Sequence, residues 1–318
     1  MNAVRVTNLD GPAGLRVHEV PPPDRAPGEV LVDVKAVAPA FPDLLMSRGE
    51  YQIKPDLPFS PGSDFAGVVI ESDPGSEFVP GTRVAGCLSF GAAAQRVAVS
   101  VDRIYPLPAD LDFSEAAALP MNYLTAHFAL VTRAGLRAGE HVLVLGGSGG
   151  VGLAAIQVAA GLGARVIAVV STTERGKVAV AAGAQYAVLR EDFVTAAGSL
   201  TGGRGVDVVV DVVGGDIRNA LRSLAPLGRV LAVGFASGEI PTVKVNRLLL
   251  TNTDVRGVES SFLWSAGISR QAWDELIRLR EAGYIKPVVR AGGDLTNYGA
   301  ALQALDRRDA IGRTVLTA

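Results

Sequence analysis

Three glycines near the middle of the chain, Gly147, Gly149 and Gly152, have the spacing G-x-G-x-x-G. An aliphatic run, Val142 to Leu145, comes directly before them, and an apolar helical pattern follows. In a strand–turn–helix of this kind the glycines permit a tight turn, let backbone N–H groups approach a diphosphate, and let helix and strand pack closely. The helix N-terminus adds partial positive charge. The residues predicted to form such a diphosphate-binding turn are Gly147, Ser148, Gly149, Gly150, Val151 and Gly152.

The same spacing on its own is also typical of a flexible turn. Here a second apolar strand, Arg165 to Val170, follows the helical pattern and completes a strand–helix–strand unit. This context favours dinucleotide binding over a flexible turn.

Polar and basic residues come after that second strand. NAD-specific domains place an Asp or Glu there to bind the ribose 2′-hydroxyl, whereas this chain has Ser171. Hydroxyl and cationic side chains suit a 2′-phosphate, so the sequence predicts NADPH rather than NADH. The predicted ligands of the phosphate are Ser171, Thr172, Arg175, Lys177 and Arg190. The alternative is that Ser171 and Glu174 form a capping box for the next helix, while Arg175 and Lys177 are solvated.

The residues that could bind a metal ion are few and scattered. The three histidines, His18, His127 and His141, have no ligand spacing between them, and Cys87 is the only cysteine. A structural four-cysteine zinc site is therefore excluded, and we expect no catalytic zinc.

Alternating strands and helices between residues 141 and 258 predict a parallel sheet that helices cover on both faces. Short strands and turn signals dominate the first 107 residues, with an apolar, aromatic loop expected over residues 44–61. Helices are predicted from Ser114, over residues 122–134 and over residues 268–281, and the tail is β-like again at residues 314–316. The predicted class is α/β, with a Rossmann doubly wound domain at 120–260 inserted between two parts of a β domain, 1–119 and 261–318.

Composition narrows the functional classes. The chain has 318 residues, enough for two domains, and a net charge of −2, which gives no reason to expect nucleic acid as a partner. A single cysteine indicates a reducing compartment. Because no apolar run reaches the roughly 18 residues of a membrane span, and the N-terminus lacks a signal-peptide core, we expect a cytoplasmic protein.

The chain resembles the medium-chain dehydrogenase/reductase superfamily along nearly its whole length. Within it, the chain is most similar to the zinc-independent quinone oxidoreductases, the zeta-crystallin-like branch. The resemblance is carried by FPDLLMSRGEYQ (41–52), LPFSPGSDFAGVV (57–69), AAALPMNYLTAHFAL (116–130), VLVLGGSGGVGLAAIQ (142–157) and IGRTVL (311–316). It implies a GroES-like β domain, a Rossmann domain, NADPH as hydride donor, and a quinone or an α,β-unsaturated carbonyl as acceptor. It also implies a homodimer formed through the sheet edge near residues 251–258.

The resemblance assigns further residues. Thr125 matches a family position that contacts the nicotinamide, and Gly234 and Phe235 match the segment that binds its carboxamide. Arg313 matches a basic residue near the phosphates, with a surface ion pair as the alternative. We expect Phe41, Tyr51 and Phe262 to line the acceptor pocket and stack on a planar ring, with Tyr51 as a candidate proton donor. Each of the three aromatics is alternatively an ordinary core residue.

Several positions depart from the family pattern. Where zinc alcohol dehydrogenases carry the catalytic metal ligands, this chain has Ala40, Ser63 and Met121, none of which suits zinc. Most quinone oxidoreductases have an asparagine at the position of Ala40, near the nicotinamide, so its polar contact is missing or supplied elsewhere. Arg190 replaces a common tyrosine. Two alternatives stay open: an enoyl-thioester reductase, and a non-catalytic NADPH-binding protein that acts as a sensor or binds RNA.

Overall fold

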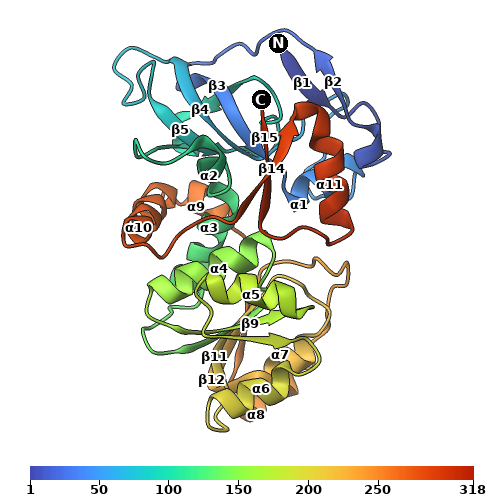
Figure 1. The fold of residues 1–318 in the computed structure, drawn as a ribbon, viewed down its shortest axis with the longest axis vertical. Coiled ribbons are helices and arrows are strands. Elements are labelled where there is room, and N and C mark those ends of the chain that lie inside the picture. Colours follow the sequence, from blue (N-terminus) through green and yellow to red (C-terminus); the bar gives the residue numbers. More distant parts are fainter. The chain divides into compact units, whose positions relative to one another are not determined.

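The computed structural model describes residues 1–318, which form two units. The first unit contains both ends of the chain, residues 1–121 and 287–318, and the second contains residues 122–286. Figure 1 shows both termini in the first unit. The chain returns to this unit at residue 287 rather than at 261, because helix α10 (Ser269–Glu281) packs against helix α4 (Gly150–Gly161) of the second unit.

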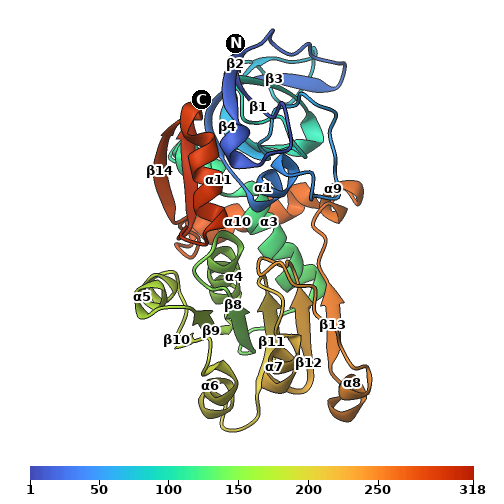
Figure 2. The ribbon, with the colours of Figure 1, turned by 90° about the vertical axis from the view of Figure 1, so that its right-hand side faces the viewer.

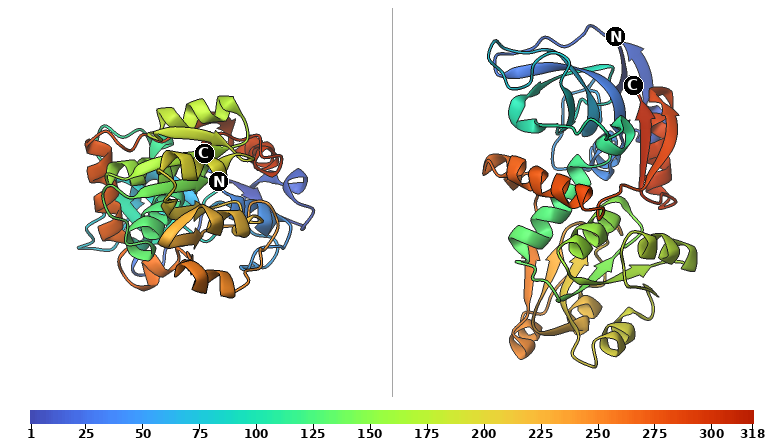
Figure 3. Two further views of the ribbon diagram at one scale, coloured as in Figure 1. Left: turned by 90° about the horizontal axis from the view of Figure 1, so that it is seen from below. Right: turned by 60° about the vertical axis from the view of Figure 1, so that its left-hand side comes forward.

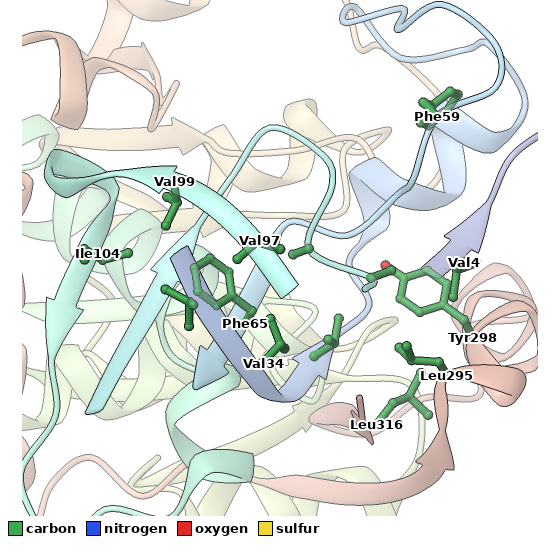
Figure 4. Packing of buried hydrophobic residues seen from close by; sticks show 14 of the residues in the cluster. Val4, Val34, Phe59, Phe65, Val97, Val99, Ile104, Leu295, Tyr298 and Leu316 are labelled. Atoms are coloured by element: carbon green, nitrogen blue, oxygen red, sulfur yellow. The ribbon is translucent and has the colours of Figure 1, made fainter. Parts of the chain in front are cut away.

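The first unit is mainly a β structure. Its larger sheet has the strand order β14-β15-β3-β4-β5-β7, with β6 paired to β3, and β1 and β2 form a separate pair. The strands are β1 (Asn2–Arg5), β2 (Arg16–Glu19), β3 (Glu29–Ala38), β4 (Asp64–Glu71), β5 (Arg83–Cys87), β6 (Arg96–Ser100), β7 (Ile104–Pro106), β14 (Val289–Asp294) and β15 (Arg313–Thr317). Alternate residues of β3 and β6 point into a core around Phe65, and Figure 4 shows Val34, Val97 and Val99 near its ring. This is the predicted β domain.

Helices of the first unit depart from the prediction in three places. Residues within the expected loop form helix α1 (Phe41–Ser47), which has Pro42 and Asp43 in its first turn. Helix α2 (Phe113–Ala117) is capped by the carboxylate of Asp112, not started by Ser114. The tail contains an unpredicted helix, α11 (Tyr298–Asp306), which packs against α1.

The second unit is a fully parallel sheet with the order β10-β9-β8-β11-β12-β13. In chain order this is 3-2-1-4-5-6, the doubly wound Rossmann arrangement, so the predicted fold class is confirmed. Its strands are β8 (His141–Leu145), β9 (Arg165–Val170), β10 (Tyr186–Leu189), β11 (Val206–Asp211), β12 (Leu224–Ala232) and β13 (Asp254–Gly257). Figure 2 shows these strands running side by side, and Figure 3 shows helices on both faces of the sheet. The order reverses between β8 and β11, the point at which ligands bind in open α/β sheets.

Further helices of the second unit are α5 (Thr173–Ala181), α6 (Phe193–Leu200), α7 (Ile217–Ser223), α8 (Asn246–Thr251) and α9 (Phe262–Ser265). Helix α3 (Pro120–His127) begins in the first unit and runs into the second, where a π-helical segment, Phe128–Arg133, continues it. The single helix predicted over residues 122–134 is thus two segments with different hydrogen bonding. None of the helices combines the length and apolar character of a membrane-spanning segment.

Candidate functional site

The glycine turn joins β8 to α4. Cβ atoms added at Gly147 and Gly152 would lie 2.9 Å from Ala168 Cβ and 2.1 Å from Gly146 O, so packing within the protein requires these two glycines. A Cβ at Gly149 would meet only Gly146 O, at 3.6 Å, which is ordinary contact. Packing therefore does not explain Gly149, whereas close approach of a diphosphate does.

No side chain caps the N-terminus of α4, whose N-cap residue is Gly149. The N–H groups of a first helical turn need acceptors, and a diphosphate supplies them with the right charge. The turn that the sequence predicted over residues 147–152 therefore fits a dinucleotide.

The residues after β9 do not form the capping box of Ser171 and Glu174 that was the alternative to phosphate binding. Thr172, and not Ser171, is the N-cap of α5, and its hydroxyl accepts a hydrogen bond from Arg175 N at 3.3 Å. The Ser171–Glu174 capping box is therefore wrong, and exposed Ser171 lies just outside the cap. Arg175 is not simply solvated, because its guanidinium donates to Ser148 Oγ at 3.1 Å and ties α5 to the glycine turn.

Two further basic residues lie near this strand end. Arg190 follows β10, and its backbone N–H donates to Val170 O at 3.1 Å, which places it beside the end of β9. Exposed Lys177 lies one turn into α5 and lines a groove of about 790 Å³ with Thr173 and Leu189. The structure thus brings hydroxyl and basic groups to the carboxyl ends of β9 and β10, with no acidic residue at Ser171.

Asp211, at the end of β11, holds the loop that follows this strand. Its carboxylate accepts hydrogen bonds from Val213 N at 3.0 Å and Gly214 N at 2.8 Å, and burial raises its pKa. Gly214 has a φ of 72°, and a Cβ there would lie 2.9 Å from the Phe235 ring. The loop after β11 and the predicted residues Gly234 and Phe235 are therefore neighbours. Sequence reasoning missed Asp211, although an Asp before V-V-G-G is a turn signal.

Helix α3 supplies Thr125, which is buried. One turn earlier, Asn122 is 4% exposed, and its Nδ2 has no hydrogen-bond partner. Residues three apart lie on the same side of a helix, so Asn122 and Thr125 face the same way. Sequence reasoning missed Asn122 because nothing local distinguishes a buried, unpaired amide from a surface one.

The three aromatics predicted for the acceptor pocket lie in different elements. Phe41 is the first residue of α1 and is 37% exposed, while half-buried Tyr51 packs against the core of the first unit. Phe262, on α9 of the second unit, is 53% exposed and contacts Phe128 with ring centroids 5.9 Å apart.

Arg313 has a different position from the one predicted. It lies on β15 in the first unit, buried, and its Nη2 donates to Ala38 O at 2.8 Å and to the Asp64 carboxylate. A guanidinium whose charge is neutralised in a buried ion pair is not available to a phosphate. The predicted phosphate contact is therefore corrected to a structural ion pair.

Asp64 is the centre of this buried cluster. It accepts a hydrogen bond from Met121 N at 2.9 Å as well as from Arg313. Burial outweighs the guanidinium charge and raises the pKa of Asp64 to about 6. The carboxylate thereby anchors the first turn of α3.

Asp43 holds a second buried cluster. It accepts hydrogen bonds from Ala40 N at 2.7 Å, Gly62 N at 3.1 Å, Ser63 Oγ at 3.1 Å and the Tyr298 hydroxyl at 2.9 Å. Burial is the main cause that raises the pKa of Asp43. Ala40 and Ser63, which stand where zinc enzymes carry ligands, are fixed by these bonds. The structure contains no group of three or more His, Cys, Asp or Glu side chains that could hold a metal ion.

Each of the two units contains a segment that matches a known protein family. Residues 26–109 match the family described as alcohol dehydrogenase GroES-like domain, and residues 150–281 match the family described as zinc-binding dehydrogenase. Quinone oxidoreductase-like protein 2 of Bos taurus is 37% identical over 95% of this chain and 89% of its own length.

Solved structures are similar over the whole chain. A probable oxidoreductase from Mycobacterium abscessus has a TM-score of 0.92 and 41% identity, covering 100% of this chain and 99% of that one. The quinone oxidoreductase from Thermus thermophilus, studied also in complex with NADPH, has a TM-score of 0.87 and 34% identity, with both chains covered completely. The glycine turn, the 3-2-1-4-5-6 sheet and these similarities together show that the chain belongs to the quinone oxidoreductase family of the medium-chain dehydrogenase/reductase superfamily.

Proposed function

We propose that this protein transfers a hydride from NADPH to a quinone or an α,β-unsaturated carbonyl, without a metal ion. The observation that carries the proposal is the N-terminus of α4, which no side chain caps and where Gly149 leaves room for a diphosphate. The neighbouring strand β9 ends at Ser171, without an acidic residue. The NADPH complex of the Thermus thermophilus relative supports the choice of dinucleotide.

Within the second unit, each group of residues has a part in holding the dinucleotide. The backbone of residues 147–152 would bind the diphosphate, and Ser171, Thr172, Lys177 and Arg190 the 2′-phosphate, with Arg175 supporting the turn through Ser148. Thr125, Gly234 and Phe235 would contact the nicotinamide. When bound, NADPH supplies the hydride; the protein holds donor and acceptor in contact and excludes water.

The acceptor must already be electron-poor, since neither unit offers a cluster of metal ligands that could polarise an alcohol or a carbonyl. Phe41, Tyr51 and Phe262 are the proposed acceptor-binding residues. A quinone takes up one hydride and one proton to give a hydroquinone, and an enone takes the hydride at its β-carbon and a proton at its α-carbon. The Tyr51 hydroxyl is the proposed source of that proton.

The first test is cofactor preference. Ser171→Asp places a carboxylate where a 2′-phosphate would lie and where a ribose 2′-hydroxyl could donate to it. We expect wild-type protein to favour NADPH over NADH in kcat/KM, and the variant to lower that ratio by about 100-fold, or ~2.7 kcal/mol. Steady-state rates with a quinone, an enone and an enoyl thioester measure the ratio and separate the acceptor classes. Equal use of NADH and NADPH by the wild type would contradict the proposal.

Asn122 is proposed to supply the polar contact that Ala40 lacks. An unpaired buried donor costs about 1–3 kcal/mol, so its retention calls for a partner such as the nicotinamide carboxamide or the acceptor carbonyl. We expect Asn122→Leu to keep or raise the melting temperature while lowering kcat/KM about tenfold. Calorimetry and steady-state kinetics on the same preparation test this. Wild-type kinetics in a stabilised variant would show that Asn122 has no partner in the reaction.

We also propose a homodimer formed at the β13 edge. The segment before β13 exposes apolar side chains, among them Ile240 (81% exposed), Leu249 (75%) and Leu250 (77%). Such a patch beside an unpaired strand edge is typical of an interface. We expect Leu249→Asp/Leu250→Asp to be monomeric by analytical ultracentrifugation, while Val79→Asp, at an exposed apolar residue of the first unit, leaves the dimer intact. A monomeric wild type would rule the interface out.

A further inference from the structure

Helix α4 contains one polar residue within its buried apolar surface, Gln157. It is 2% exposed, and its neighbours Ile156 and Val158 are fully buried. A leucine would continue the apolar pattern of this helix, and burying an amide instead is unfavourable unless all its hydrogen bonds are made. The partners of Gln157 therefore explain why the amide is there.

Those partners come from two distant segments of the second unit. Gln157 Oε1 accepts hydrogen bonds from the Tyr123 hydroxyl at 2.7 Å and from Lys286 N at 3.0 Å, and Gln157 Nε2 donates to Lys286 O at 2.7 Å. Because the Lys286 N–H can only donate and its carbonyl can only accept, they fix the orientation of the amide. Tyr123 is itself buried and completes the set.

The positions of these partners in the chain are what make the contact informative. The chain passes from the first unit to the second between residues 121 and 122, and back between 286 and 287. Tyr123 follows the first crossing immediately, and Lys286 directly precedes the second. One side chain thus binds both chain segments at the point where they enter and leave the second unit.

Gln157 also connects two parts of the proposed cofactor site. Its own helix begins at the glycine turn, and Tyr123 lies on α3 between Asn122 and Thr125. A dinucleotide bound along this unit would be held by α4 at its diphosphate and by α3 at its nicotinamide. The relative position of the two helices would therefore determine where the nicotinamide lies.

We propose that Gln157 is a positioning residue: it locks α3 and the exit of the chain at Lys286 to the phosphate-binding helix, and thereby determines where the nicotinamide lies within the second unit. This inference rests on the proposed function. It assigns Gln157 no contact with cofactor or substrate, so its loss affects alignment rather than binding of the diphosphate.

The test compares Gln157→Leu with Tyr123→Phe, which removes one of the three bonds, and with Val158→Ala, which weakens the packing of α4 without touching the amide. Hydrogen–deuterium exchange is measured on the dinucleotide-free protein, and kcat, KM and NADPH affinity are measured separately. We expect Gln157→Leu to speed exchange at least tenfold at residues 122–127 and 284–287. We also expect it to lower kcat at least tenfold and to leave NADPH affinity within about threefold of the wild type. Tyr123→Phe should lower kcat less than Gln157→Leu does, and it should speed exchange in α3 but not at residues 284–287, because both bonds between Gln157 and Lys286 remain.

Two results would overturn the proposal. One is wild-type exchange and kcat in Gln157→Leu. The other is that Val158→Ala lowers kcat as much as Gln157→Leu does at the same loss of melting temperature. That result would show that weaker packing of α4, and not the loss of the amide bonds, causes the fall of kcat. If Gln157→Leu does not fold, Tyr123→Phe decides: faster exchange in α3 together with a lower kcat supports the proposal, and wild-type values of both overturn it. Failure of the wild type to use NADPH would refute the proposed function, whereas the exchange result on the free protein would still test the lock itself.

Discussion

Gly149→Val is expected to give a folded protein that has lost NADPH affinity by about 100-fold, ~2.7 kcal/mol. Gly149 has φ −82° and ψ 174°, an extended conformation that suits valine, and an added Cβ meets only Gly146 O at 3.6 Å. The Cβ of the valine is therefore accommodated, and its two methyl groups are the added bulk. They occupy the space through which a diphosphate would reach the N–H groups of α4.

Isothermal calorimetry measures the affinity, and circular dichroism measures the melting temperature. Gly198→Ala is the matched control, because Gly198 lies in α6 of the same unit and a Cβ there meets nothing within 4 Å. We expect it to bind NADPH as the wild type does. Undiminished affinity in Gly149→Val would exclude this turn as the diphosphate site.

Arg313→Leu is expected to destabilise the first unit by about 3–5 kcal/mol at pH 8, because it leaves the Asp64 carboxylate buried without its cation. Urea unfolding measures the change. Arg290→Leu, at an exposed arginine of the neighbouring strand β14, should change the free energy of unfolding by less than about 0.5 kcal/mol.

The stability lost in Arg313→Leu should depend on pH. In the folded wild type the pKa of Asp64 is about 6, above its ordinary value of 3.8. Because the folded state binds this proton more tightly than the unfolded state, the stability contributed by the group is fully present below about pH 4 and lost as pH rises through 6. Without Arg313 the pKa rises further. The deficit of Arg313→Leu relative to the wild type is therefore expected to shrink from pH 8 to pH 4, and a deficit independent of pH would show that the ion pair is not its cause.

Much of the second unit was predictable because its signals are local. The strands β8, β9 and β11 are short and consist mainly of valine and other aliphatic residues whose side chains are almost fully buried, as in strands covered on both faces. Glycine spacing and the polar strand end at Ser171 also lie within a few residues of the elements they define. The site residues predicted for this unit were inferred from the same local signals, whereas Asp211 and Asn122 had none strong enough to be noticed.

Helix α1 and strand β14 were not predicted, for two different reasons. Pro42 and Asp43 at the start of α1 are typical of a helix N-terminus, but the aromatic and proline content of residues 44–61 favoured a loop. Strand β14 has exposed or half-buried residues and two glycines, so it lacks an apolar alternation and exists through its pairing with β15. Its prediction needed the partner strand.

The sequence by itself determined the fold class, the glycine turn between β8 and α4, and the absence of an acid after β9. Only the tertiary structure decided the partners of the buried polar groups: Arg313 with Asp64, 249 residues apart, Gln157 with Lys286, 129 apart, and the lack of a hydrogen-bond partner for Asn122 Nδ2. Backbone preference and hydrophobic periodicity act over a few neighbouring residues. A buried charge or amide is instead satisfied by whichever group packing brings within about 3 Å, wherever that group lies in the chain.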